Sequence, residues 1–329
     1  DLTSLALNQD LSVITKGLSL KALVNFKNWS ETSYTRSIKS NIYKVKDGSY
    51  NPETGEYDYQ LLQTGDQFLS QSGISRNSDQ TFYFDARLDW KRSFGDHNLT
   101  AMAMYMMREY RSDVLPNRNQ GYSGRVTYDY ASKYLVEFNF GYNGSERLAA
   151  GQRFEFFPAV SAGWVASSEK FWEPISKYIN HFKIRGSYGL VGSDAFASGA
   201  PHFLYQNNIG IGSAHKFWTG LPTSEISKQG PGFYVLAVQD AGWEHVKKFD
   251  IGFDMMLFNQ LNITFDYFHD KRERILMSRA SWPSMLGYWG SKPWSNIGEV
   301  ENQGFELSLN WTKQFGKDLT LRSEERRVG

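Results

Sequence analysis

The feature that most constrains this chain is an alternation of apolar and polar side chains with a period of two. The clearest case lies between residues 79 and 94. Its apolar row is Phe82, Phe84, Ala86, Leu88 and Trp90, and its polar row is Tyr83, Asp85, Arg87, Asp89 and Lys91. Successive side chains of a β-strand point to opposite faces, so this period predicts a strand that has two different faces.

The same alternation returns along the whole chain and predicts an all-β fold. Strong segments are 122–130, 134–143, 182–190, 248–257, 261–267 and 305–311, and weaker ones are 2–9, 18–36, 99–111 and 156–166. A loop at 37–78 contains two short apolar runs, 41–46 and 57–63, around a turn-rich stretch, which predicts a projecting hairpin. We therefore expect about 11–12 strands.

The connections between these segments alternate between short and long. Short ones are 95–98, 131–133, 258–260 and 314–318, with 10–17 slightly longer and 167–181 expected to hold one short helix capped by Ser168. Long ones are 37–78, 144–155, 191–244 and 271–302, and 111–120 is the shortest on that side. Counting along the strands places every short turn at one end, which is typical of outer-membrane barrels.

A soluble β-sandwich or propeller would also alternate, and two features favour a membrane barrel instead. The strands run for about ten residues, which matches a tilted membrane crossing. Aromatic residues make up 16% of the chain and gather near strand ends, as in the interfacial girdles of barrels. The polar row would then face the lumen, and its candidate residues are Asp85, Arg87, Asp89, Arg125, Asp129, Glu137 and Asn139.

Composition and motifs argue against catalysis, cofactors and nucleic acid. The net charge is +1, cysteine is absent, and the six histidines form no His-x-x-x-His pair. Asp85 and Asp89 share one face and could bind a cation or act in acid–base chemistry. Alternatively, Arg87 lies between them in the same row and balances their charge. We expect no metal, no cofactor and no enzymatic activity.

The last eight residues, 322–329, depart from the pattern of residues 1–321. They read RSEERRVG, are charged, and lack the alternation and the β-forming residues of the rest. We interpret residues 1–321 as barrel and residues 322–329 as a non-native tail resembling a translated sequencing adaptor. Because no signal peptide opens the chain and no aromatic strand closes it, we also expect it to be part of a longer protein.

Five segments in order resemble TonB-dependent outer-membrane transporters, and most closely their SusC/RagA-type branch. They are 115–125 (LPNRNQGYSGR), 134–146, 156–164 with 169–171, 183–192, and 296–306 (NIGEVENQGFE). The last segment supplies the family signature residues Asn296, Gly298, Asn302, Gly304 and Glu306. From its residues alone, this last segment could equally be an ordinary loop that returns to a strand.

The resemblance implies a barrel of about 22 strands in the bacterial outer membrane, with a plug in its lumen. The plug and the segment that contacts the TonB-type energising protein precede the matched part in this family, so we expect neither here. The resemblance further implies a SusD-like surface lipoprotein as partner, and import of glycans or, in some members, peptides. The leading hypothesis is import of an oligosaccharide. The alternatives are a siderophore or peptide importer, or a structural or adhesive barrel.

Aromatic residues in two long loops are the candidate ligand contacts. They are Trp218, Tyr234, Trp243, Trp282, Trp289 and Trp294. Aromatic faces can stack on sugar rings while nearby polar groups bind the hydroxyls. The alternative is that these rings pack the loops together or contact the lipoprotein.

Overall fold

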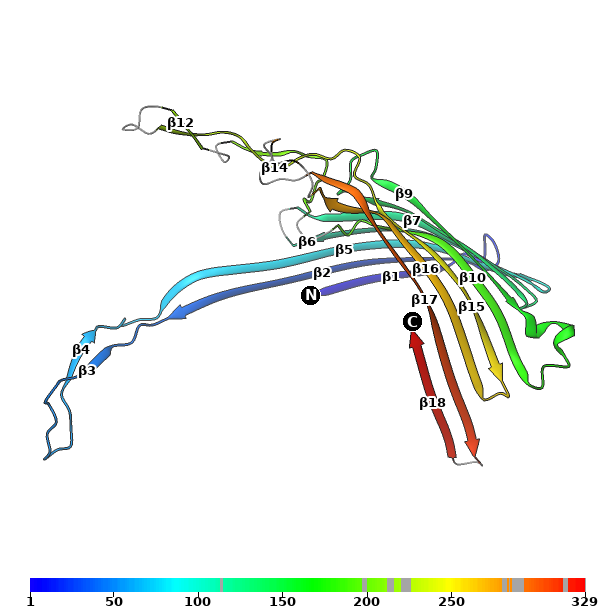
Figure 1. Cartoon of the computed structure of the whole chain (residues 1–329), viewed down its shortest axis with the longest axis horizontal. Helices are drawn as coiled ribbons and strands as arrows, with labels where there is room; N and C mark the ends of the chain where they lie inside the picture. Colours follow the sequence, from blue (N-terminus) through cyan, green and yellow to red (C-terminus); the bar gives the residue numbers. More distant parts are fainter. Residues whose placement is uncertain are drawn as a thin grey trace. The chain divides into compact units, whose positions relative to one another are not determined.

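The computed structural model describes residues 1–112, 115–196, 200–211, 216–219, 226–279, 283, 285, 293–315 and 319–328. Its main element is a twelve-stranded sheet with the order β1-β2-β5-β6-β7-β8-β9-β10-β15-β16-β17-β18 (Figure 1). These strands are β1 (Leu2–Asp10), β2 (Leu18–Ser37), β5 (Ser70–Phe94), β6 (His97–Arg111), β7 (Asn117–Tyr130), β8 (Tyr134–Ser145), β9 (Phe154–Val165), β10 (Ile179–Ser193), β15 (Glu244–Leu257), β16 (Leu261–Ser278), β17 (Trp294–Phe315) and β18 (Leu319–Val328).

The chain divides into two compact units, which are described separately. The first comprises Asp1–Thr3, Phe26–Thr81 and Tyr110–Pro116. Within it, β3 (Ile42–Val45) pairs antiparallel with β4 (Tyr59–Gln63), which confirms the predicted hairpin. The rings of Tyr50 and Tyr57 lie 5.0 Å apart in the turn-rich stretch between them.

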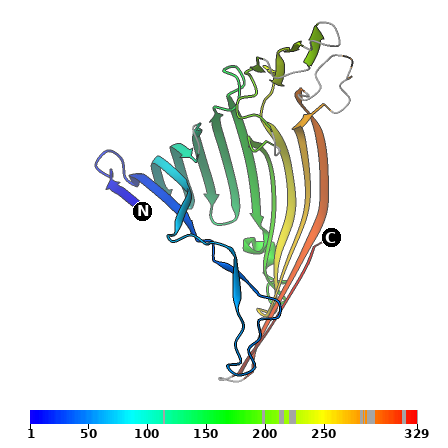
Figure 2. The ribbon, with the colours of Figure 1, turned by 90° about the vertical axis from the view of Figure 1, so that its left-hand side faces the viewer.

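The second unit comprises Ser4–Asn25, Phe82–Glu109 and Asn117–Gly329 and holds most of the sheet. Its strands run side by side and antiparallel from β7 to β18 (Figure 2). Two further small sheets, β11 (Asn208–Gly210) with β14 (Gly232–Val235) and β12 (Lys216–Thr219) with β13 (Ile226–Gln229), lie within the long connection between β10 and β15. The all-β fold with about twelve strands is confirmed.

Backbone hydrogen bonds join the short connections of the second unit to one another. The amide of Lys91 donates to Gly17 at 3.0 Å, that of Ala131 to Asp96 at 2.7 Å, that of Val165 to Lys133 at 2.8 Å, that of Phe258 to Tyr178 at 2.9 Å, and that of Thr312 to Gln260 at 2.9 Å. The predicted clustering of the short turns at one end is therefore confirmed for these turns. At Gly17 (φ +84°) a β-carbon would overlap the Lys91 carbonyl, so only glycine fits there.

Two of these turns are tight hairpins made without glycine. Ala131 and Ser132 have φ of 51° and 57°, and Phe258 and Asn259 have φ of 54° and 55°. A type I′ hairpin turn needs positive φ at both central residues, because its twist then matches that of the flanking strands.

Two expectations about element boundaries were wrong. The loop expected at 271–302 is shorter, because β16 continues to Ser278 and β17 begins at Trp294. A bulge between Arg272 and Ile275, with Arg274 at φ 59°, shifts the register and hides the alternation. The helix expected in 167–181 is replaced by two 3₁₀ turns, Ala166–Ser168 and Lys170–Trp172, neither with a side-chain cap. Ser168 ends the first turn, and extended Glu169 separates the two.

In the tail, Arg322–Val328 lies in β18 and pairs with β17. Strand pairing uses backbone groups, so a charged segment without alternation can still occupy the edge of a sheet. Whether residues 322–329 are non-native stays a prediction.

The exposure of the two faces differs from that expected for a closed soluble core, in which the apolar face would be the buried one. Apolar side chains in mid-strand are exposed, with Leu88 and Phe138 each 43% exposed. Carboxylates on the other face are less exposed, with the Glu137 side chain 26% and the Asp266 side chain 19% exposed. Buried apolar residues such as Leu148, Phe157 and Leu276 lie instead near the long loops. No helix in the described part of the chain is long and apolar enough to span a membrane.

Ring contacts across neighbouring strands define what we call the apolar face. Tyr105 lies 6.3 Å from Phe84 and 5.0 Å from Tyr122, measured between ring centroids. Phe253 lies 5.9 Å from Phe182 and 5.6 Å from Phe265. The opposite side, called the polar face, carries the charged members of the alternating rows.

Candidate functional site

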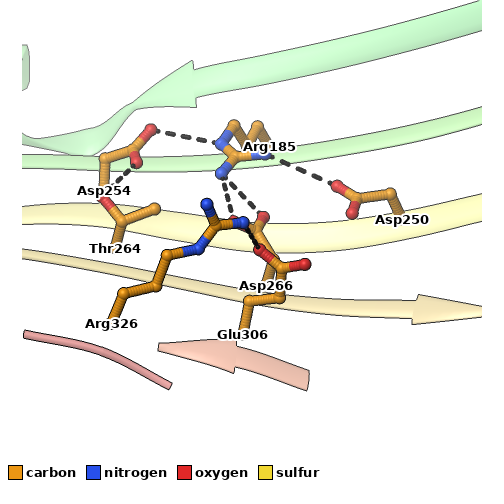
Figure 3. Close-up of polar contacts among 7 residues, drawn as sticks. All are labelled: Arg185, Asp250, Asp254, Thr264, Asp266, Glu306 and Arg326. Carbon is orange, nitrogen blue, oxygen red and sulfur yellow. Dashed lines mark hydrogen bonds and ion pairs between the residues drawn. The ribbon is translucent and has the colours of Figure 1, made fainter. Parts of the chain in front are cut away.

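The polar face is organised around Arg185 on β10. Arg185 is directly opposite Gly252 on β15, and Gly252 is directly opposite Asp266 on β16. Nη2 of Arg185 reaches across the middle strand to lie 2.7 Å from the Asp266 carboxylate (Figure 3). This is possible because Gly252 has no side chain. A β-carbon there would overlap a carboxylate oxygen of Asp266.

Two more aspartates share the same guanidinium. Nε of Arg185 lies 3.2 Å from Asp254, and Nη1 lies 3.5 Å from Asp250. Asp254 also accepts a hydrogen bond of 3.1 Å from the Thr264 hydroxyl. One cation is therefore shared by three carboxylates that are each about two thirds buried or more, which leaves the cluster of these four residues acidic. Glu306 lies beside the cluster and pairs with Arg326 at 2.8 Å.

The predicted polar residues on β7 and β8 form a second cluster on the same face. Arg125 binds Glu137 at 2.9 Å, and the Asn139 amide donates to Glu137 at 2.7 Å. Asp129 accepts a bond of 2.9 Å from Asn98 on β6. These four predicted residues are thus held in pairs and not left as isolated charges.

On β5 the structure supports charge balance at Asp89, one of the two predicted carboxylates. Nε of Arg87 donates to Asp89 at 3.0 Å, and Lys21 lies 3.6 Å from the same oxygen. Asp89 is therefore engaged by two cations. Among the residues that the structure describes, no group of three histidine or acidic side chains is placed to hold a metal ion.

Two hollows open on the polar face and meet at Arg185 and Asp250. One, of about 440 Å³, is lined by Asp129, Glu137 and Lys183 as well as by those two residues. The other, of about 430 Å³, adds Lys248, Asp266 and Glu306. A wall of this composition can bind polar groups of either charge by hydrogen bonds.

The signature segment holds the β16–β17 ladder to the long loops. The Asn296 amide donates to the carbonyls of Gly242 (3.0 Å) and Arg274 (2.6 Å), and its oxygen accepts from the Gly242 amide at 3.0 Å. At Gly298 a β-carbon would overlap Ile275 and Met277. Further along, Asn302 pairs with Asp270, Gly304 with Phe268 and Glu306 with Asp266 across the ladder.

Trp243 and Trp294 pack among other apolar residues. Trp243 is 4% exposed, contacts Leu148 and Phe157, and donates from Nε1 to the Arg153 carbonyl at 3.1 Å. Trp294 packs against the buried cluster that contains Leu204 and Leu276. Their environment is that of the packing alternative, and the buried ring of Trp243 offers no face to a ligand in this structure.

Of the other four predicted ligand contacts, the structure describes the side chain of Tyr234 only. Tyr234 lies on β14 and is 57% exposed. Trp218 falls on β12, but its side chain lies outside the described part of the structure. Trp282 and Trp289 also lie outside the described residues. Their roles stay predictions.

Four residues central to the polar face, Arg185, Asp250, Asp254 and Asp266, were not among the predicted site residues. Each sits in the polar row of its own strand, so its facing was predictable. Their meeting depends on the register of three strands, which alternation alone does not define. The signal that could have identified them is Gly252, a glycine that interrupts the charged row of Lys248, Asp250 and Asp254.

Comparison with known proteins identifies the family. Residues 7–326 match the family model described as TonB dependent receptor-like, beta-barrel. TonB-dependent receptor P3 of Formosa agariphila is 31% identical over 198 residues, which are 60% of this chain and 18% of that protein. TonB-dependent receptor SusC of Bacteroides thetaiotaomicron is 23% identical over 311 residues, which are 90% of this chain and 27% of that protein.

A solved structure supports the fold. The structure of the RagAB peptide transporter matches with a TM-score of 0.65 at 18% identity, over 95% of this chain and 35% of that one. The chain thus spans only about a fifth to a quarter of the length of the curated relatives described above. With the family model covering nearly all of its strands, the chain belongs to the TonB-dependent receptor β-barrel family of the bacterial outer membrane.

Proposed function

We propose that the complete protein imports a bulky nutrient, with oligosaccharides as the ligand class, and that residues 1–321 form part of the barrel wall. The observation that carries this proposal is the polar face, with its two hollows that meet at Arg185 and Asp250. In a membrane barrel the exposed apolar face contacts lipid, so the polar face lines the lumen. The predicted lumen-facing residues, from Asp85 to Asn139, would then contact the plug or the passing ligand.

The ligand class is argued from the aromatic residues of the long loops. Tyr234 is exposed, and a tyrosine ring can stack on the apolar face of a sugar while its hydroxyl binds a sugar oxygen. Trp218, Trp282 and Trp289 would add to the same surface. Polar side chains of the wall would then exchange hydrogen bonds with the hydroxyls as the ligand moves inward.

A second candidate is import of a peptide. The cluster of three aspartates around Arg185 favours ligands that carry charge, and peptides do so at both ends. The similar fold of the RagAB peptide transporter is compatible with this choice. Import of an iron chelate and a purely structural barrel are the remaining alternatives.

The proposal includes partners outside this chain. A TonB-type protein of the inner membrane would supply energy through a segment that precedes this part of the barrel. A SusD-like surface lipoprotein would cover the long loops, and outer-membrane lipid would surround the apolar face. No nucleic acid, cofactor or covalent chemistry takes part.

Uptake by living cells tests the function. Cells with the intact gene and cells with the gene deleted would receive a fluorescent oligosaccharide, a fluorescent peptide or a ferric chelate, each with and without a protonophore. We expect gene-dependent oligosaccharide uptake that the protonophore abolishes. Gene-dependent uptake of only the peptide, or of only the chelate, would show that this compound and not an oligosaccharide is the ligand. The absence of gene-dependent uptake of all three would favour a structural barrel.

A further inference from the structure

Phe268 on β16 is an aromatic residue in an otherwise polar row. Asp266 and Asp270, two positions before and after it, are its neighbours in this row, and Asp266 contacts Arg185 on the polar face. Because residues two apart share a face of a strand, the Phe268 side chain belongs to the polar face as well. Its ring therefore lies on the side that the proposed function assigns to the lumen, opposite to the ring of Phe265 on the apolar face.

The neighbouring strands leave space beside this ring. Phe268 is directly opposite Asp250 on β15 and directly opposite Gly304 on β17. Side chains at directly opposite positions share a face, with β-carbons about 4.5–5.5 Å apart, so the Asp250 carboxylate lies beside the ring on one side. Gly304 has no side chain, so the directly opposite position on the other side does not cover the ring. Phe268 is accordingly partly exposed.

The ring lines the second of the two hollows on the polar face, which has a volume of about 430 Å³. This volume lies within the range of about 300–1,000 Å³ that is typical of sites for small molecules. The other polar-face residues of its lining used below are Arg185, Lys248, Asp250, Asp266, Asp270 and Glu306. The hollow thus combines one apolar platform with several hydrogen-bonding side chains.

The carboxylates of this lining keep acceptor capacity. Asp270 accepts a bond of 3.0 Å from Lys248, and Asp250 lies 3.5 Å from Arg185. An ionised carboxylate has about four lone-pair sites, so one such contact leaves room for further donors. The Lys248 ammonium carries three N–H donors. A sugar unit matches this arrangement, because its ring has an apolar C–H face and its hydroxyl groups both donate and accept hydrogen bonds.

The charge of the lining restricts which sugars fit. Two positive charges, on Arg185 and Lys248, stand against four negative charges on Asp250, Asp266, Asp270 and Glu306. A sugar that carries a carboxylate or a sulfate would be repelled by this excess, and like charges at close range can cost several kcal/mol. A sugar unit without acidic groups meets no such repulsion.

We propose that Phe268 and the side chains around it bind a sugar unit without acidic groups as the oligosaccharide passes along the wall. The sugar ring stacks on Phe268, its hydroxyls donate to Asp250 and Asp270, and Lys248 donates to a hydroxyl oxygen. This inference rests on the proposed import of oligosaccharides. It adds a binding site in the wall of the barrel, away from the long loops, and it excludes acidic oligosaccharides as the ligand.

Uptake by cells that produce the full-length protein tests the inference. The probes are fluorescent hexasaccharides of glucose, xylose and mannose, which are uncharged, and of galacturonic acid, which is acidic. We expect saturable uptake of at least one uncharged probe, and uptake of the acidic probe that is at least about tenfold less efficient. For the uncharged probe, F268A should raise the half-saturating concentration about tenfold, and F268Y, which keeps the ring, should restore it.

The matched control is F305A. Phe305 follows Gly304 on β17, and its ring lies 6.4 Å from that of Phe265, so it belongs to the apolar face. F305A therefore removes a nearby ring from the other side of the wall and should leave the half-saturating concentration unchanged. The amount of folded protein in the outer membrane and its thermal midpoint would be measured for every variant.

The outcomes separate this inference from the proposed function. Unchanged half-saturation in F268A, an equal rise in F305A, or equally efficient uptake of the acidic probe would each overturn the inference and leave oligosaccharide import standing. A lower thermal midpoint of F268A with unchanged half-saturation would overturn it too, because the ring would then pack against another part of the protein. The absence of gene-dependent uptake of all four probes would contradict the proposed function and the inference together.

Discussion

Arg185 and Asp266 lie on strands that are not neighbours, yet the Arg185 guanidinium is 2.7 Å from the Asp266 carboxylate. The strand between them places Gly252 at the crossing point, in direct register with both residues. A three-strand charge contact of this kind fixes register, because a slip of one residue on any strand would move one member to the other face.

Replacement of Gly252 by alanine should destabilise the barrel by about 1–3 kcal/mol, because the new methyl group overlaps the Asp266 side chain and the Phe265 carbonyl. The temperature at which the folded band disappears on unboiled gels measures this. Gly186→Ala is the matched control, since its nearest neighbour would be the Asp250 carbonyl at an ordinary 3.5 Å. An equal effect in both variants would contradict the proposed role of Gly252.

Replacement of Arg185 by glutamine should leave Asp250, Asp254 and Asp266 without their shared cation. We expect the free energy of unfolding to fall by about 1–2 kcal/mol. The fall is moderate because these groups are partly exposed. High salt should reduce the loss because it screens the repulsion among the carboxylates. In a double-mutant cycle with D266N, the two effects should not add, and strict additivity would argue against the contact.

Glu169, in the turn between β9 and β10, predicts a pH effect. It accepts 2.8 Å and 3.0 Å bonds from the Tyr134 hydroxyl and Lys133 Nζ, and these lower the pKa of the Glu169 carboxyl. The stabilisation is therefore fully present above the ordinary pKa of a glutamate and is lost as the pH falls through the lowered value. The thermal midpoint should exceed that of E169Q at pH 7, and the difference should shrink below about pH 4. If the difference in thermal midpoint did not change with pH, the charge of Glu169 would not contribute to the stability.

Trp243 and Tyr234 should respond in opposite ways to replacement by alanine. W243A removes a buried ring and should cost about 3–5 kcal/mol, so that limited proteolysis cuts the adjoining loops faster. Y234A removes an exposed ring and should leave proteolysis unchanged while weakening oligosaccharide uptake. Normal uptake by Y234A would remove Tyr234 from the proposed binding surface.

The strands and their facing could be predicted because membrane and lumen impose different side chains on alternate positions. The same reasoning failed at Arg274, where a bulge shifts the register by backbone geometry that alternation does not encode. It also could not separate Trp243 from Tyr234, since packing in the loops depends on contacts between distant segments. Arg185 and its aspartates show the same limit, because their cluster exists only once three strands are in register.

The central claim is that the apolar face of the sheet contacts lipid and the polar face contacts water. Residues 135–140 on β8 allow a direct test. This stretch contains no cysteine, so single cysteines can be introduced one at a time and labelled with nitroxides in the full-length protein in bilayers. Collision with oxygen, which concentrates in hydrocarbon, should be high at 136, 138 and 140, and collision with a water-soluble nickel chelate should be high at 135, 137 and 139. The absence of this alternation, or the reverse pattern, would contradict the account.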